Sequence, residues 1–397
     1  MIQPPVAGLF VLAAGLLLLL AGCAPGPAPH PRMDVAFVPR SGEFFTANGT
    51  RLSAQDFSAM AARVDYLLIG ETHDSVCDHA AQAEMVRSLA CAGVPFVLGL
   101  EMIPANMTAP LASFNRGETP AEDLEQALDW DDLWGYPFEL FVETFRTAAR
   151  AKAPVYGLNI PSALIKKTRR MGLSSARELD RLDAAERAQF PSKILFPPPE
   201  QIAELDAVLR MHPDVDKELE ASRRDRFLFI QSVWDSKMAE EAAALRRRHR
   251  RLVVALAGEG HVLFGYGIKR RLQAFDPGAK TLLVGGVRSL DQFDPHAADV
   301  FFYCPPEHAS RMGMRLQDRE TGVEVVAITP GGRAFQAGLR PGDVIEEANG
   351  IPVVDLMDLH RAGSEAYHDN APLRFVIRRG GERYTVDLGR LGQGRSR

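Results

Sequence analysis

Five short apolar runs limit the folds that this chain can adopt. They are YLLIG at 66–70, FVLGL at 96–100, VYGL at 155–158, LVVALA at 252–257 and TLLVGG at 281–286. Runs without polar alternation are typical of strands that are buried on both faces, and helical patterns separate them here. The sequence therefore predicts an α/β domain with a largely parallel sheet flanked by helices, and a helical insertion in the polar stretch 161–250.

The composition is that of an ordinary globular protein. The chain has 397 residues, 46% of them hydrophobic and 24% charged, and a net charge of −5. This length predicts two to three domains, and the composition excludes disorder, collagen and coiled coil as the main class. A mildly acidic chain has no reason to bind nucleic acid by releasing counterions, so we expect no nucleic-acid partner.

Residues 1–22 carry no charged side chain, and Cys23 follows them. The apolar run at 10–20 is shorter than the roughly 20 residues of a membrane span and suits a signal peptide. Leu20-Ala21-Gly22-Cys23 resembles a bacterial lipobox, which implies cleavage before Cys23 and a lipid anchor on its thiol. The alternative is a transmembrane anchor. In a Gram-negative cell, Ala24 favours the outer membrane, facing the periplasm. Residues 23–40 would then be the lipidated cysteine and a Pro-rich tether.

The other cysteines are Cys77, Cys91 and Cys304. Cys77 and Cys91 flank a predicted helix, which would hold them roughly 21 Å apart, too far for a disulfide. We expect all three to be small buried apolar residues, in an exported protein without a disulfide framework.

Polar residues follow the predicted strands, where ligands bind in parallel sheets. Gly70-Glu71-Thr72-His73 follows the first run, Glu101 the second, and Gly258-Glu259-Gly260-His261 the fourth. Two Gly-x-x-His motifs with a Glu at a third strand end predict a site. His79 is expected to point elsewhere on its helix, with a structural role.

Two kinds of chemistry suit these residues. His73, Glu101 and His261 could hold a divalent metal ion that activates water. Without a metal, these three with Glu71 and Glu259 could act as general acids and bases. The alternative is that these residues have only structural roles, capping helices and forming hydrogen bonds within loops.

The motifs resemble those of the ChaN-like haem-binding uptake lipoproteins of the Tiki/TraB superfamily, over about residues 41–305. The segment Trp134-Gly135-Tyr136-Pro137 and a helix with Gln231, Trp234, Asp235 and Met238 add to the likeness. The ChaN branch implies haem binding linked to iron uptake, and the Tiki branch implies metal-dependent proteolysis. A homodimer is a further option.

Haem needs an apolar slot and an axial ligand. His261, Tyr266 and Tyr136 are the candidate ligands, and Trp234 and Met238 are candidate contacts. The choice between haem and a divalent metal ion stays open at this point.

Residues 306–397 resemble a PDZ domain. The likeness rests on TPGG at 329–332, AGLRPGDVI at 337–345, and Asn349-Gly350, a strong hairpin signal. Met312, Gly313, Met314 and Leu316 lie at the expected carboxylate-binding loop, where a peptide or protein C-terminus would add a strand. The alternative is a groove used only for docking within the chain.

These observations predict a lipid-anchored protein that binds haem or metal, with a PDZ domain that contacts a partner. The alternative is a metal-dependent hydrolase or peptidase whose PDZ domain recruits substrate. A third option is a scaffold in which the PDZ domain alone is functional.

Overall fold

The computed structural model describes residues 39–210, 217–290, 293–319 and 322–391. The expected signal segment, Cys23 and residues 24–38 of the tether lie outside these ranges. Within the ranges, no helix combines the length and the apolar character needed to cross a membrane. The lipid anchor and its transmembrane alternative both concern residues 1–23, so both stay predictions.

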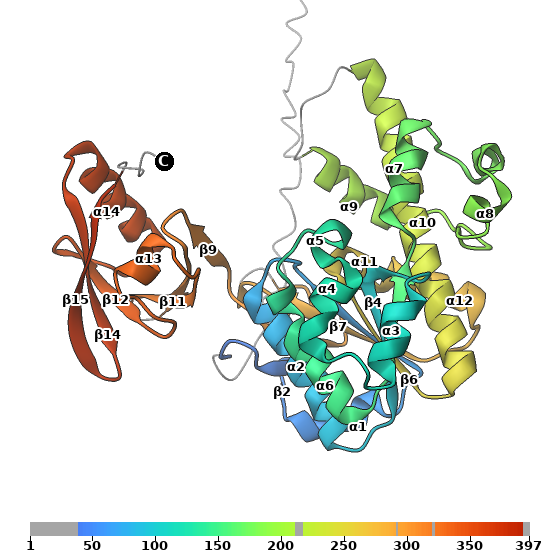
Figure 1. Ribbon diagram of the computed structural model, residues 1–397, viewed down its shortest axis with the longest axis horizontal. Coiled ribbons are helices and arrows are strands. Elements are labelled where there is room, and N and C mark those ends of the chain that lie inside the picture. The colour runs from blue at the N-terminus through green and yellow to red at the C-terminus, as the bar shows by residue number, and fades with distance from the viewer. Residues whose placement is uncertain (1–38, 211–216, 291–292, 320–321, 392–397) are drawn as a thin grey trace, which may run out of the picture. The chain divides into compact units, whose positions relative to one another are not determined.

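The first sheet has eight strands in the order β2-β1-β8-β7-β3-β6-β4-β5 (Figure 1). They are β1 (Phe44–Thr46), β2 (Arg51–Leu52), β3 (Tyr66–Glu71), β4 (Phe96–Pro104), β5 (Val155–Asn159), β6 (Leu252–Gly258), β7 (Thr281–Val287) and β8 (Val300–Tyr303). The strands from β8 to β5 pair in parallel, whereas β1 pairs antiparallel with both β2 and β8. The five apolar runs became β3 to β7, so the predicted α/β class is confirmed.

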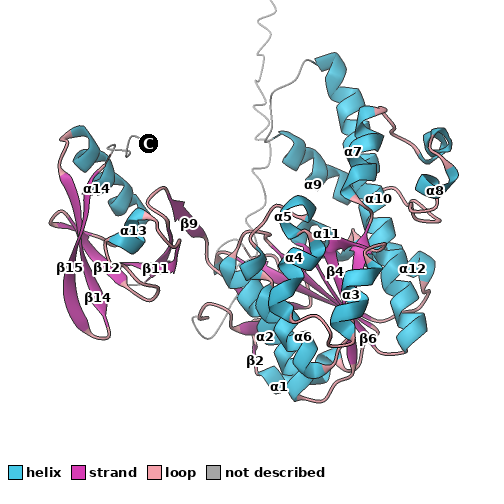
Figure 2. Ribbon diagram, viewed as in Figure 1, coloured by secondary structure: helices cyan, strands magenta, loops and turns pink. Residues whose placement is uncertain are grey.

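Helices cover both faces of this sheet, as Figure 2 shows in cyan and magenta. Those outside the insertion are α1 (Ala54–Ala61), α2 (Val76–Cys91), α3 (Thr108–Asn115), α4 (Leu124–Leu128), α5 (Trp130–Leu133), α6 (Val142–Ala151), α11 (Glu259–Val262) and α12 (Ile268–Phe275). Side chains alternate along a strand. Val254 and Leu256 of β6 therefore join the core under α1, α2 and α6, while Val253 and Ala255 join the core under α12. Burial on both faces explains why the run is apolar throughout.

The helical insertion lies between β5 and β6, as predicted. It contains α7 (Ser162–Arg170), α8 (Ala184–Arg187), α9 (Pro199–Arg210) and the long α10 (Lys217–His249). Leu164 and Ile165 of α7 pack with Phe229 and Ile230 of α10 in a core of their own. Further along, Ala239 and its neighbours on α10 pack against the sheet. One helix thus joins the insertion to the sheet.

The structure corrects the prediction for all three cysteines. Cys77, in the first turn of α2, and Cys304, directly after β8, form a disulfide with Cα atoms 5.8 Å apart. The prediction that they are separate apolar residues is wrong, because the short strand β8 brings Cys304 to the amino end of α2. Cys91 is free, as expected, but exposed rather than buried.

The second sheet is antiparallel and belongs to the C-terminal part of the chain. Its order is β15-β14-β12-β11-β10-β9, with β13 paired to β12. Its elements are β9 (Glu307–Ser310), β10 (Met314–Arg319), β11 (Gly322–Ile328), α13 (Arg333–Gln336), β12 (Val344–Ala348), β13 (Ile351–Pro352), α14 (Leu356–His368), β14 (Pro372–Arg379) and β15 (Glu382–Arg390). Asn349 and Gly350 join β12 to β13 with φ of 49° and 79°, the positive values of a type I′ turn. The predicted hairpin is confirmed.

Candidate functional site

The three strands that carry the predicted site residues are neighbours, in the order β3-β6-β4. Glu71 is the last residue of β3 and His73 follows two positions later. His261 lies on α11 directly after β6, whereas Glu101 lies inside β4, which continues to Pro104. His73, Glu101 and His261 all line one cleft of about 340 Å³. The parallel sheet therefore brings together residues that are far apart in the sequence.

The first glycine of each Gly-x-x-His motif packs closely against a residue of the other motif. A Cβ on Gly258 would lie 2.7 Å from Cε1 of His73. A Cβ on Gly70 would lie 3.1 Å from the Cα of Glu259. Each motif therefore needs a residue without a side chain at its first position.

His261 and Glu101 form a buried ion pair. Nδ1 of His261 donates to Asp235 Oδ1 at 2.6 Å, and its Nε2 lies 3.3 Å from Glu101 Oε1. The other Glu101 oxygen accepts the Gly258 N–H at 2.6 Å. Burial opposes the charged form of both groups, yet the two carboxylates raise the pKa of His261 well above its usual value. The positive charge of His261 and its hydrogen bond lower the pKa of Glu101 to about 2.

Asp235 is itself paired on its second oxygen. Oδ2 accepts a hydrogen bond from Gln201 Nε2 at 3.0 Å and lies 3.3 Å from Nη1 of Arg271. The side chains of Asp235 and Arg271 are fully buried. Gln201 and Arg271 hold the Asp235 carboxylate in place. The Asp235 carboxylate in turn holds the His261 ring in one orientation.

His73 is held from one side only. Its Nδ1 donates to Glu71 Oε1 at 3.1 Å, and its ring meets those of Trp134 and Tyr136 at 4.9 and 5.4 Å. Burial alone would lower the pKa of His73, but the hydrogen bond to Glu71 and the charge of Glu101 raise it. Among the described residues, Nε2 has no hydrogen-bond partner. His73 thus presents an open nitrogen to the cleft.

His79 contacts both residues of the His73–Glu71 pair. Its Nε2 donates to the carbonyl oxygen of His73 at 3.0 Å, and its Nδ1 lies 3.3 Å from Glu71 Oε2. The expectation that His79 points away from the motif is wrong, because α2 begins directly after the motif and turns this side chain back toward it. Its contacts are with the backbone and a carboxylate of the motif, and the structural role stays a prediction.

Glu259 points to another partner. Its carboxylate lies 3.6 Å from Nη2 of Arg288, which also donates to Thr72 Oγ1 at 2.7 Å and pairs with Asp78. Glu259 therefore lies at the edge of the site, beside Arg288, whose hydrogen bonds to Thr72 and Asp78 stabilise the loop that carries His73.

The walls of the cleft combine apolar side chains with a basic rim. The apolar lining residues are Met102, Pro104, Leu133, Trp134, Ile160, Ile165 and Trp234, and the basic ones are Lys166 and Arg169. The Arg169 guanidinium lies over the Trp234 ring, 5.7 Å from its centroid. The indole N–H of Trp134 is buried and has no partner among the described residues.

The other candidate haem contacts are placed unequally. Trp234 lines the cleft, and Tyr136 packs beside His73. Met238 is fully buried in the core between α10 and the sheet, so it is not positioned to contact a ligand in the cleft. Tyr266 is not among the cleft residues and stacks on Phe264 at 5.5 Å. Asp235, for which no role was predicted, supplies the partner of His261 Nδ1.

The three residues predicted to hold a metal ion are partly paired with one another. In the described part of the chain, no group of three or more His, Cys, Asp or Glu side chains is arranged to hold one. Glu101 and His261 lie 3.3 Å apart as an ion pair. General-base chemistry at His261 is also disfavoured, because its pKa is raised well above the usual value and an imidazolium cannot accept a proton.

Two family models match this chain. Residues 57–272 match the family model described as haem-binding uptake, Tiki superfamily, ChaN. The chain belongs to this family. Residues 310–389 match the PDZ domain, so the chain joins a ChaN-like domain to a PDZ domain. A search of curated proteins gives no significant match.

Two solved structures resemble these two parts. One is described as cofacial haem binding to ChaN of Campylobacter jejuni. It has 20% identity and a TM-score of 0.53, and the match covers 65% of this chain and 95% of that one. This likeness supports the fold of the ChaN-like domain. The other is the HtrA3 PDZ domain bound to a phage-derived ligand, with 25% identity, a TM-score of 0.18, and coverage of 21% of this chain and 88% of that one.

Proposed function

We propose that the ChaN-like domain binds haem in this cleft and that His73 is the residue that holds the iron. The observation that carries the proposal is the His73 ring, with Nδ1 fixed by Glu71 and Nε2 open to an apolar cleft. A hydrogen bond on the far nitrogen is the usual way to orient a histidine ligand.

The rest of the cleft fits the same ligand. Trp134 and Trp234 supply aromatic walls, and Lys166 and Arg169 supply positive charge at the rim. Haem carries apolar faces and two carboxylates, and its iron takes an axial ligand from the protein. Lys166, Arg169 and the unpaired indole N–H of Trp134 are the groups that would bind the carboxylates.

Haem titration of the full chain, followed by the Soret band, tests the proposal. We expect His73→Ala to weaken binding at least tenfold and to shift the band, because the axial nitrogen is lost. His360→Ala, at an exposed histidine of the PDZ domain, is the matched control and should bind like wild type. A normal titration by His73→Ala would remove His73 as ligand. No Soret change with wild type would refute haem binding altogether.

We also propose that the protein is exported, anchored by lipid at Cys23 on the periplasmic side of the outer membrane, and serves iron uptake. The Cys77–Cys304 disulfide supports export, because such bonds persist in oxidising compartments. Radiolabelled palmitate should be incorporated by wild type and not by Cys23→Ser, which should also leave the membrane fraction. Equal labelling of both proteins would contradict the anchor.

A further inference from the structure

The edge of β10 on which a PDZ ligand adds is already paired. β10 pairs with β11 on one side and with β9 on the other. β9 is antiparallel to β10, in the register Ser310↔Met314 to Glu307↔Gln317. It therefore runs toward the carboxylate-binding loop at 311–313, the direction that a peptide ligand takes when it adds to this edge.

Ser310 occupies the position of a ligand's terminal carboxylate. Its hydroxyl accepts the N–H of Met312 at 3.2 Å, and its carbonyl oxygen accepts the N–H of Gly313 at 3.0 Å. The loop carbonyls face the other way, since Met312 O accepts the N–H of Ala334 and Gly313 O that of Thr329, both at 2.9 Å. One serine thus supplies two oxygens to the two amides that would otherwise receive a carboxylate.

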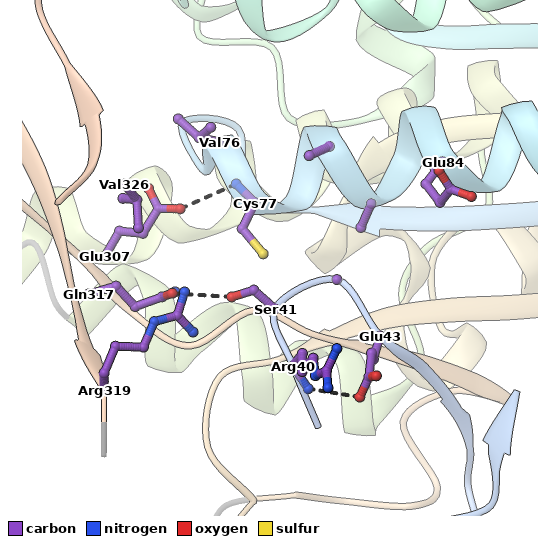
Figure 3. Close-up of a pocket in the computed structure, with 13 residues that line it drawn as sticks. Arg40, Ser41, Glu43, Val76, Cys77, Glu84, Glu307, Gln317, Arg319 and Val326 are labelled. Atoms are coloured by element: carbon purple, nitrogen blue, oxygen red, sulfur yellow. Dashed lines mark hydrogen bonds between the residues drawn. The ribbon is translucent and has the colours of Figure 1, made fainter. Parts of the chain in front are cut away.

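Contacts of Glu307 hold the other end of β9. Its carboxylate, only 6% exposed, bonds to Nε of Arg315 on β10 at 2.9 Å. Its second oxygen accepts the N–H of Cys77 at the start of α2, at 3.2 Å, as Figure 3 shows. Gln317 of β10 donates to the carbonyl of Pro305 at 3.0 Å. Its side-chain oxygen accepts the Ser41 hydroxyl, a bond of 3.1 Å that Figure 3 marks.

The disulfide fixes the segment that leads into β9. Cys304 is bonded to Cys77, and Pro305-Pro306 alone separate it from Glu307. Two prolines restrict the backbone to extended conformations. The start of β9 is therefore tied to the same helix turn that binds the Glu307 side chain.

We propose that β9 is an internal ligand of the PDZ domain, with Ser310 in place of a C-terminal carboxylate, and that the Cys77–Cys304 disulfide and Glu307 keep it bound. The external partner is a peptide C-terminus that replaces residues 307–310. This inference rests on the PDZ domain and is independent of haem binding.

The internal strand competes with any external ligand and so lowers the affinity of that ligand for the β10 edge. A segment joined by a short connection acts at a local concentration on the order of millimolar or more. A peptide that binds the open edge should therefore bind the closed edge at least tenfold more weakly.

The probe is the hexapeptide Pro-Pro-Glu-His-Ala-Ser, residues 305–310, carrying fluorescein at its amino end and a free carboxylate. Binding to the full chain is measured by fluorescence anisotropy. The opened protein is Glu307→Arg with Cys77→Ser and Cys304→Ser, because arginine repels Arg315 and the disulfide tie to α2 is gone. The matched control is Glu382→Arg with Cys91→Ser, which changes an exposed glutamate and the free cysteine.

We expect the opened protein to bind the free-acid peptide at least tenfold more tightly than wild type and the control, and not to bind the C-terminal amide. Hydrogen exchange should show faster exchange of β10 amides and unchanged protection of β14 and β15. Equal affinity for wild type and the opened protein would overturn the proposal. So would absence of binding to an opened protein whose β14 and β15 remain protected. Reducing the wild-type disulfide needs no substitution, and unchanged β10 exchange after reduction would overturn the role of the disulfide.

Discussion

Loss of the Cys77–Cys304 disulfide should destabilise the ChaN-like domain strongly. The bond joins residues 227 positions apart, so the loop that it closes in the unfolded chain is very long. In the chain-entropy model, closing such a loop stabilises the folded state by about 5 kcal/mol. For a domain of this size, 1 kcal/mol shifts the melting temperature by about 2–4 °C. Reduction, or Cys304→Ser, should therefore lower it by roughly 10–20 °C.

Thermal unfolding followed by circular dichroism, with and without reductant, measures this shift. Cys91→Ser is the control, because Cys91 is free and exposed and its replacement should change the melting temperature little. Reductant should have no effect on Cys304→Ser beyond that of the substitution. A wild-type melting temperature that does not respond to full reduction, confirmed by thiol counting, would refute the reasoning.

Three further predictions concern pH and packing. The pKa of Glu101 is about 2 rather than its usual 4.5, so its stabilising contribution should be present above pH 4.5 and lost as the pH falls toward 2. The pKa of His261 is raised above 6.5, so its contribution is complete below pH 6.5 and lost as the pH rises through the raised pKa. Glu101→Gln should flatten the acid side in urea melts between pH 2 and 7. Phe375→Ala, in the PDZ core, should cost about 3–5 kcal/mol, seen as a lower denaturation midpoint of that domain. Gly157→Ala would place a Cβ 2.4 Å from a carbonyl oxygen of β4 and should lower the melting temperature clearly, whereas Gly260→Ala, which meets nothing within 4 Å, should not clash.

The strands were predictable from sequence because burial on both faces leaves a local mark. The apolar run at 252–257 shows it best, since every residue of β6 is buried. β8 has only four residues, and its position is fixed by pairing with β7 and β1. That pairing is between distant segments, so the sequence did not reveal the partner of Cys304.

The site was predictable in its centre and not at its margins. Motif spacing after parallel strands located His73, Glu101 and His261, because strand ends meet at one edge. Trp234 and Met238, both predicted haem contacts, lie on the same helix α10. In the structure Trp234 lines the cleft, whereas Met238 lies in the core against the sheet. A carboxylate at 235 within an apolar stretch of a buried helix was the available sign of a partner for a histidine.

The strand order also has a consequence for how the chain folds in time. β3 lies early in the sequence, but its neighbours are β6 and β7, with Tyr66 opposite Val253 on one side and Thr281 on the other. The centre of the sheet therefore cannot close until most of the ChaN-like domain has been synthesised, and such distant pairing is slow. During that interval Cys77 is nearer along the chain to Cys91 than to its native partner, and short loops close more readily. Formation of α2 alone separates these two thiols, so an early helix protects the chain from the wrong disulfide before the right one can form.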